Sequence, residues 1–106
     1  MTRIEFRLTM PSTGSANGRW SGEGRNYLIV KTLRDQEAVA LLEGKAERTW
    51  FHRWEDGWGA RVTARILAPG SRRSSSDGFA GYDWMVANIL AHGDTNDAPS
   101  SLRQSE

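Results

Sequence analysis

Two histidines supply most of the acid–base and metal-binding chemistry that this sequence offers. His52 lies in a tryptophan-rich segment, His92 follows an apolar run, and the chain contains no cysteine. No HExxH-type spacing joins either histidine to a second metal ligand. Without cysteine there is no thiolate nucleophile, no thiolate metal ligand and no disulfide. We therefore expect no metal site and no cofactor.

Patterns for other kinds of catalysis are also missing from the sequence. The serines at 74–76 stand in a polar loop and lack the G-x-S-x-G context of a nucleophile elbow. Glu55 and Asp56 are neighbours in an expected turn, so their carboxyl groups should diverge instead of acting as an acid–base pair. The sequence therefore predicts that the protein is not an enzyme.

A glycine-rich segment, GSANGRWSGEGR over residues 14–25, carries side chains that are common at protein interfaces. It lacks the lysine and Ser/Thr of a P-loop, and it joins two expected strands instead of opening a helix. It is either a contact loop that presents Arg19, Trp20 and Arg25 or only a connection between strands. The polar loop SRRS at 71–74 is the most basic local sequence, and it either meets a phosphate group or is simply solvated.

Three of the five tryptophans, Trp50, Trp54 and Trp58, fall in an expected hairpin within residues 48–67. The turn decides which face they occupy, because a slip of one residue moves every side chain of a strand to the other face. Two turn lengths are compatible with the residues between the strands, and they lead to different functions.

A two-residue turn at Asp56 and Gly57 places Phe51 opposite Val62 and points the first two tryptophans outward. Aromatic rings between arginines bind single-stranded nucleic acid by stacking and charge neutralisation. The candidate nucleic-acid site of this alternative consists of Trp50, His52, Trp54, Arg61 and Arg65.

A three-residue turn over 55–57 places Trp50 opposite Val62 instead, with the glycine in the left-handed position. Phe51 then falls on the polar face of the hairpin. The opposite face gathers Trp50, Trp54, Trp58, Ala60, Val62, Ala64 and Ile66. Burial of three tryptophans would stabilise a small chain strongly, so we favour this register and a core position for the tryptophans.

Two further segments have the patterns of strands. Residues 3–10 alternate, with apolar side chains at the even positions, as in a half-buried strand. Residues 27–33 carry a more continuous apolar run, which indicates a strand in the middle of its sheet. Together with the hairpin, these segments predict four strands.

Two segments predict helices. The first is expected over residues 36–43, between a capping Asp35 and a terminating Gly44. The second helix is expected to run from about Tyr82 to His92, and Gly93 should end it. Their apolar sides consist of Ala38, Val39, Leu41 and Leu42 in the first and of Met85, Val86, Ile89 and Leu90 in the second.

The order β-β-α-β-β-α has no long parallel crossover and indicates an α+β fold. We expect a two-layer sandwich in which a mostly antiparallel four-stranded sheet carries both helices on one face. With 106 residues, the chain has room for one domain, which we place at residues 1–93. The polar residues 94–106 are expected to form a disordered tail.

Composition narrows the possible partners. Fourteen basic and thirteen acidic residues leave a net charge of +1, which is weak for a dedicated nucleic-acid domain. Twelve of the basic residues are arginine, which binds carboxylates and phosphates through paired hydrogen bonds. No apolar run approaches the roughly 20 residues that span a bilayer, and the N-terminus lacks a signal-peptide core. We expect a cytoplasmic protein without a membrane partner.

Three strings, GRWSGEGRNY at 18–27, RWEDGWGARVTARI at 53–66 and FAGYDWMVANILAHGD at 79–94, resemble a group of small phage proteins. Bacteriophages and prophages of proteobacteria encode this group, which has no assigned activity. The resemblance implies a short accessory protein in the cytoplasm of a bacterial host. It also implies a stoichiometric binder, such as an anti-CRISPR-like inhibitor of a host defence system.

The sequence thus predicts a small protein-binding protein, monomeric or homodimeric, whose partner is a host or phage protein. The candidate partner-binding residues are Arg19, Trp20, Arg25, Tyr82 and Trp84, because tryptophan, tyrosine and arginine dominate interface hot spots. Trp84 has a second interpretation, in which it covers the sheet. The alternative function is single-stranded nucleic-acid binding through the exposed-tryptophan register.

Overall fold

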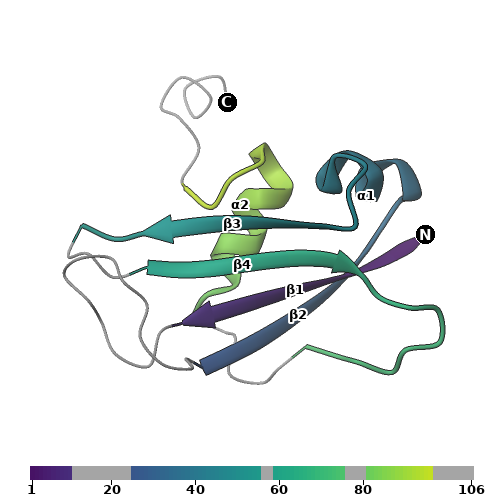
Figure 1. The fold of residues 1–106 in the computed structure, drawn as a ribbon, viewed down its shortest axis with the longest axis horizontal. Coiled ribbons are helices and arrows are strands. Elements are labelled where there is room, and N and C mark those ends of the chain that lie inside the picture. Colours follow the sequence, from purple (N-terminus) through teal and green to yellow (C-terminus); the bar gives the residue numbers. More distant parts are fainter. Residues whose placement is uncertain (11–24, 56–58, 76–80, 97–106) are drawn as a thin grey trace.

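The predicted strands and helices form in the predicted order. The computed structural model of the protein describes residues 1–10, 25–55, 59–75 and 81–96. The elements are β1 (Thr2–Met10), β2 (Arg25–Leu33), α1 (Asp35–Leu42), β3 (Glu47–Arg53), β4 (Gly59–Ile66) and α2 (Asp83–His92), as Figure 1 shows. No helix among the described residues is long and apolar enough to cross a membrane.

The four strands form one antiparallel sheet in the order β2-β1-β4-β3. The predicted α+β class is therefore confirmed. The two hairpins, β1-β2 and β3-β4, meet where β1 pairs with β4, so these two strands are central.

The prediction that residues 27–33 form a central strand is wrong, because β2 lies at an edge of the sheet. The apolar run of β2 has another cause, because apolar side chains on both faces of this strand are at least half-buried. Ile29 is buried toward the helices, while Leu28 and Val30 on the other face are half-buried. The loop after β4 passes this edge, where the Val30 backbone N–H donates to Ser75 Oγ at 3.0 Å.

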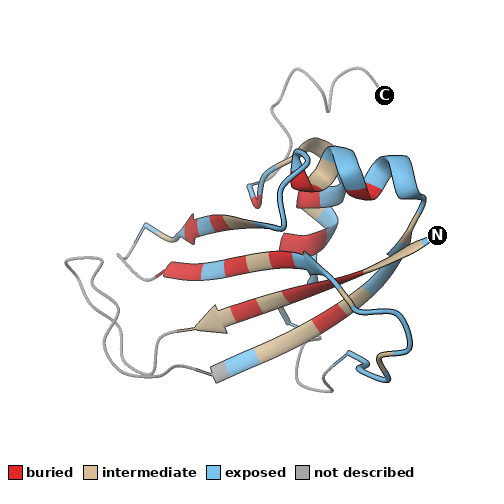
Figure 2. Cartoon of the chain, turned by 45° about the vertical axis from the view of Figure 1, so that its right-hand side comes forward, coloured by how far each residue is buried: buried red, intermediate tan, exposed pale blue. Residues whose placement is uncertain are grey.

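The core lies between one face of the sheet and the two helices. Alternate residues of β1, namely Ile4, Phe6 and Leu8, are completely buried, as the alternation predicts. Figure 2 shows buried and less buried residues alternating along β4. Both helices contribute to the same cluster, which consists of Ile4, Phe6, Leu8, Ile29, Ala38, Leu42, Trp50, Ala60, Val62, Ala64, Met85, Val86 and Ile89. Both helices therefore cover the same face.

The β3-β4 hairpin has the register of the three-residue turn, which was the favoured alternative. Trp50 lies opposite Val62 and Arg53 lies opposite Gly59. Trp50 is 7% exposed, and its indole Nε1 donates to the carbonyl oxygen of Gly93 at 2.8 Å. Trp54 is half-buried against the core, and Trp58 lies outside the described residues. Ile66 is an exception to the predicted core face, since this last residue of β4 is 53% exposed.

Helix α1 begins one residue earlier than predicted, and Asp35 does not cap it. Arg34 is the N-cap residue and makes no side-chain capping bond. Asp35 instead lies in the first turn, where its carboxylate accepts a hydrogen bond from Thr2 Oγ1 at 2.7 Å. This hydrogen bond and the nearby chain amino group hold the pKa of Asp35 below its usual value. Gly44 was expected to end the helix, but two residues do so together. Glu43 already has a left-handed backbone conformation with φ 53°, and Gly44 follows with φ 72°.

The apolar sides of the helices are narrower than predicted. In α1, only Ala38 and Leu42 are buried and Val39 is 61% exposed. In α2, the predicted Leu90 is 39% exposed. A short helix contacts a sheet with one side only, through residues spaced three or four apart in the sequence. Apolar residues that flank this side therefore stay at the surface.

Packing continues two residues past the expected domain boundary at residue 93. Gly93 ends α2 with φ 98°. Beyond it, Thr95 is 2% exposed, and its hydroxyl lies 3.1 Å from Nδ1 of His52. The first residues of the predicted tail therefore pack against β3, and residues 97–106 lie outside the described part of the chain.

Candidate functional site

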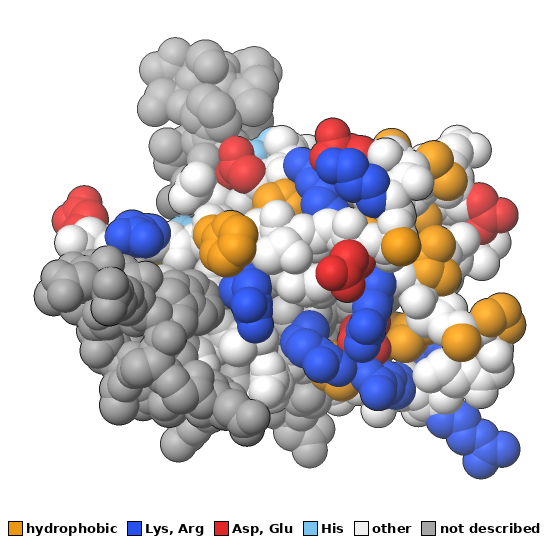
Figure 3. Space-filling view, in the orientation of Figure 1, with side chains coloured by type: hydrophobic (Ala, Val, Ile, Leu, Met, Phe, Trp, Pro, Cys, Tyr) orange, Lys and Arg blue, Asp and Glu red, His pale blue; other side chains and the backbone are white. Residues whose placement is uncertain are grey.

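One face of the sheet carries no helix in the part of the chain that the structure describes. Both helices pack on the other face, and Figure 1 looks onto the free face with α2 behind the strands. Figure 3, in the same orientation, shows lysine and arginine side chains gathered around acidic ones over the middle of the sheet. We call this surface the arginine face. Its arginines are Arg7, Arg61 and Arg65 from the strands and Arg73 from the loop after β4.

The strand register arranges the arginine face in rows that cross β1, β4 and β3 in turn. These rows are Glu5-Arg65-Glu47, Arg7-Thr63-Thr49 and Thr9-Arg61-Phe51. Directly opposite residues have Cβ atoms about 4.5–5.5 Å apart. Thr63 therefore lies at the centre, with Arg7 beside it and Arg61 and Arg65 two positions away along its own strand.

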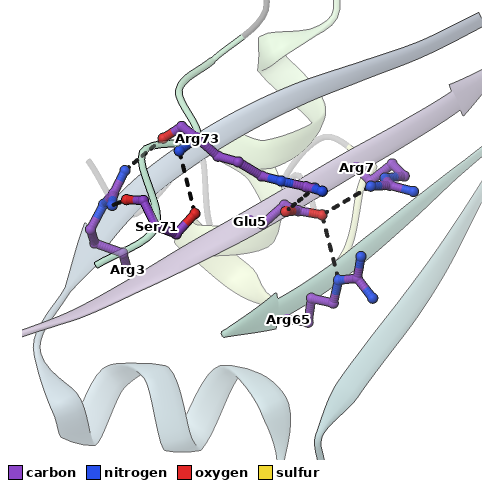
Figure 4. A network of polar contacts seen from close by, with 6 residues as sticks. All are labelled: Arg3, Glu5, Arg7, Arg65, Ser71 and Arg73. Carbon is purple, nitrogen blue, oxygen red and sulfur yellow. Dashed lines mark hydrogen bonds and ion pairs between the residues drawn. The ribbon is translucent and has the colours of Figure 1, made fainter. Parts of the chain in front are cut away.

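Glu5 is buried although it belongs to the free face of the sheet, with 2% of its side chain exposed. Three guanidinium groups surround its carboxylate. Arg73 Nη1 lies 2.8 Å from Oε2, and Arg7 Nη2 and Arg65 Nε lie 3.4 and 3.5 Å from Oε1. Figure 4 shows these groups converging on Glu5 from separate segments. The arginines are each between 40% and 49% exposed, so they cover the carboxylate and still present a side to solvent.

Hydrogen bonds hold the loop after β4 against the sheet, which explains how Arg73 reaches Glu5. Arg3 Nη1 donates to the carbonyl oxygen of Ser71 at 2.6 Å, and Arg3 Nη2 donates to that of Arg73 at 2.7 Å (Figure 4). The basic loop at 71–74 was expected either to contact phosphate or to be solvated. In the structure its Arg73 forms an ion pair within the molecule, while Arg72 is exposed.

Phe51 and Arg61 form the most exposed part of the arginine face. They are directly opposite each other on β3 and β4, and Phe51 is 70% exposed. Arg61 is also exposed, and its side chain makes no hydrogen bond or ion pair with any residue that the structure describes. A guanidinium group without such partners has all five of its N–H donors available for a ligand. Aromatic residues and arginine are enriched at protein interfaces, so this pair offers suitable chemistry for binding.

An open depression of about 290 Å³ lies over the middle of the arginine face. Its lining residues are Glu5, Arg7, Thr9, Glu47, Thr49, Arg61, Thr63 and Arg65. The hydroxyl groups of Thr49 and Thr63 are 3.1 Å apart and share one hydrogen bond. The depression thus combines hydroxyl groups at its centre with guanidinium groups around it.

The predicted partner-binding residues are not part of the arginine face where the structure describes them. Arg19 and Trp20 lie outside the described residues, and the structure describes the backbone of Arg25 at the start of β2 but not its side chain. Tyr82 is half-buried against the core, with its ring centroid 6.0 Å from that of Tyr27.

Trp84 belongs to the layer of helices, in agreement with its second interpretation as a cover for the sheet. It is 36% exposed, and its indole Nε1 donates to the carbonyl oxygen of Gly81 at 3.2 Å. Its ring meets that of His52 edge to face, with centroids 5.0 Å apart. The indole ring of Trp84 therefore already makes contacts within the molecule.

The residues of the predicted nucleic-acid site are separated by the sheet, so this site is wrong. Trp50 and His52 are 7% and 9% exposed on the side of the helices. Arg61 and Arg65 lie on the opposite face, because the hairpin has the three-residue register. Trp54 is half-buried on the core side, where its ring lies 4.8 Å from that of His52.

Both histidines make contacts within the described part of the molecule. His52 contacts Thr95 and two tryptophan rings, and His92 Nδ1 lies 3.5 Å from a carboxylate oxygen of Asp94. The described part of the chain contains no group of three or more histidine and acidic residues that could hold a metal ion.

Sequence reasoning missed Glu5, Arg7, Arg73 and Phe51 as parts of one site. A signal was available for the first two, because the alternation of β1 already points them away from the core. The pairing of β1 with β4 and the position of Arg73 had no local signal.

Comparison of the chain with models of protein families, with curated proteins and with solved structures gives no significant match.

Proposed function

We propose that the protein is a non-enzymatic binding protein that docks an acidic surface of a protein partner on its arginine face. The observation that carries this proposal is the pair formed by Phe51 and Arg61. An exposed ring lies opposite a guanidinium without a partner among the described residues, on a sheet face that no described helix covers. Arginine forms paired hydrogen bonds with carboxylates, and a neighbouring ring adds apolar contact area.

A protein partner suits the arginine face better than a nucleic acid does. Glu5 and Glu47 stand between the arginines, and a chain of phosphates crossing the face would pass close to these negative charges. The chain carries a net charge of only +1. An acidic protein surface places its few carboxylates individually and can avoid both glutamates.

The class of partner, a host or phage protein, rests on the sequence resemblance alone. Small phage proteins act on host or phage proteins in the bacterial cytoplasm, and inhibition of a host defence system is one such role. Within this proposal the protein acts by occupying a surface and catalyses no reaction.

The proposal is tested by capture of partners from a bacterial lysate on immobilised protein. Phe51→Ala and Arg61→Glu should each reduce capture of a specific partner at least about tenfold, the effect expected of hot-spot residues. Val39→Ala and Arg34→Glu are matched controls, because both residues are exposed and belong to α1 or its N-cap. Equal capture by all four variants would show that the partner binds elsewhere.

A titration with a labelled single-stranded oligonucleotide distinguishes the alternative function. Under our proposal, polarisation at physiological salt should show only weak binding that does not depend on Phe51. Tight binding that weakens steeply with salt and is lost in Phe51→Ala would instead assign the arginine face to nucleic acid.

A further inference from the structure

We infer that the depression at the centre of the arginine face is a receptor for a single phosphomonoester group. This inference deepens the proposed function, since it assigns the anchor by which a ligand is held on this face. Three properties of the depression support it: the positions of its donors, its charge and its size.

The donors belong to residues that surround one position of the sheet. Thr63 lies at the centre of the face, with Arg7 across from it on β1 and Arg61 and Arg65 on either side along β4. An oxyanion above Thr63 would accept hydrogen bonds from its hydroxyl and from the surrounding guanidinium groups. Arginine binds phosphate through paired, charge-assisted hydrogen bonds, which suits this arrangement.

Glu5 holds two of these arginines in place before any ligand arrives. Arg7 contributes only Nη2 and Arg65 only Nε to the carboxylate, at 3.4 and 3.5 Å, so the other guanidinium donors stay available. Arg61 has no partner among the described residues. A site whose donors are already positioned loses less conformational entropy when it binds.

The charge of the site matches a dianion. The lining arginines, Arg7, Arg61 and Arg65, exceed the lining glutamates, Glu5 and Glu47, by one positive charge. Arg73 lies outside the lining but pairs with Glu5, and with it the excess becomes two. A phosphomonoester carries about −1.5 to −2 charges at pH 7, whereas a carboxylate or a phosphodiester carries one. At this one position, a terminal phosphate is therefore favoured over a single carboxylate or phosphodiester, and the rest of the arginine face stays available to carboxylates of a protein partner.

The size of the depression fits a small charged group. Its volume of about 290 Å³ is at the lower limit of pockets that enclose whole drug-sized ligands, roughly 300–1,000 Å³. It is also open to solvent, so the remainder of the ligand can extend over Phe51 or along the face. Both a phosphorylated side chain of a protein partner and a small phosphorylated metabolite can present such a group.

The test is an NMR titration of the full chain with inorganic phosphate, read at the backbone amides of β1 and β4. Saturable shifts centred on Thr63, with an affinity of about millimolar order, are expected. Binding of phosphoserine should weaken several-fold below about pH 6, where a phosphomonoester loses its second charge, while sulfate keeps its affinity. Shifts that do not saturate, or an affinity for acetate equal to that for phosphate, would overturn the inference.

Variants separate this site from general attraction of anions. Arg61→Gln should reduce phosphate affinity about tenfold with little effect on stability, because the Arg61 side chain makes no hydrogen bond or ion pair with a described residue. Arg34→Gln is the control, since this exposed arginine pairs with Glu37 beside α1. Equal affinities of the two variants would contradict the inference.

Phosphoserine and a nucleoside monophosphate, added in parallel, show which source of the phosphate is preferred. Tighter binding of phosphoserine supports a phosphorylated protein partner, and tighter binding of the nucleotide supports a metabolite. Phosphate binding without any partner capture would refute only the proposed function. Face-dependent capture without phosphate binding would refute only this inference.

Discussion

At the scale of single residues, Glu5 is the most consequential group of the arginine face. Burial of a carboxylate is unfavourable unless opposite charges and hydrogen bonds compensate for lost hydration. Arg73, Arg7 and Arg65 provide this compensation at 2.8, 3.4 and 3.5 Å. The same contacts orient the arginines, so one residue affects both the stability of the face and its capacity to bind.

The substitution Glu5→Gln should lower the free energy of unfolding by about 1–2 kcal/mol. It keeps the shape of the side chain but removes the charge that the three arginines share. The expected loss is at the lower end for charged hydrogen bonds, because the arginines are roughly half exposed and solvent screens them.

Urea denaturation of Glu5→Gln and of Glu47→Gln measures this effect. Glu47 is the matched control, because it flanks Arg65 from β3 but is exposed. Its substitution should change stability by no more than about 0.5 kcal/mol. Equal stabilities of the two variants would show that the burial of Glu5 has no energetic consequence.

At the scale of elements, the end of helix α2 links the helix layer to the sheet. Gly93 ends the helix with φ 98°, its N–H donates to the Ile89 carbonyl at 2.9 Å, and its own carbonyl accepts from Trp50. A positive φ is readily available only to glycine, because a Cβ atom would approach the backbone. The position of α2 over β3 therefore depends on the backbone conformation of one residue.

Gly93→Ala should destabilise the protein by about 1–2 kcal/mol through backbone strain alone. Beyond the adjoining backbone, no described atom lies within 4 Å of the Cβ that the substitution would add, so no clash with a distant residue contributes. Gly81→Ala is the matched control, since that position is equally open but lacks a positive φ, and it should be neutral or slightly stabilising. Thermal melts of both variants test the expectation, and equal losses at the two positions would contradict it.

At the scale of the whole molecule, the protein has a sheet with one covered face and one free face. The covered face holds the apolar cluster and the free face holds the charges, so apolar packing and charged groups lie on opposite sides of the same strands. The two central strands, β1 and β4, contribute to both, since they carry core residues on one face and arginines on the other.

Amide hydrogen exchange should therefore be slowest in the central strands. Every residue between Ile4 and Leu8 of β1 is paired on both sides, to β2 and to β4. Helix α1 should exchange faster, because only Ala38 and Leu42 anchor it in the core. Native-state exchange followed by NMR measures this order. Slower exchange in β2 or α1 than in β1 would show that the stable unit lies elsewhere.

Much of the fold followed from local patterns of the sequence. The alternation in residues 3–10 correctly separates the buried Ile4, Phe6 and Leu8 from the charged side of the strand. The turn residues and the gain from burying tryptophan correctly favour the register that pairs Trp50 with Val62. These features are local, because they depend on side-chain period and on a turn of a few residues.

The candidate site, in contrast, was decided by tertiary structure. The apolar run of β2 was compatible with a central strand, and only the pairing of β1 with β4 placed β2 at the edge. The same pairing brings Arg65 beside Glu5, and the loop beyond β4 adds Arg73, which is 68 residues away from Glu5 in the chain. Strand order and loop path depend on how the whole chain fills its core, so no local pattern predicts them. The sequence by itself determined which residues face away from the core, and the tertiary structure determined which of them meet.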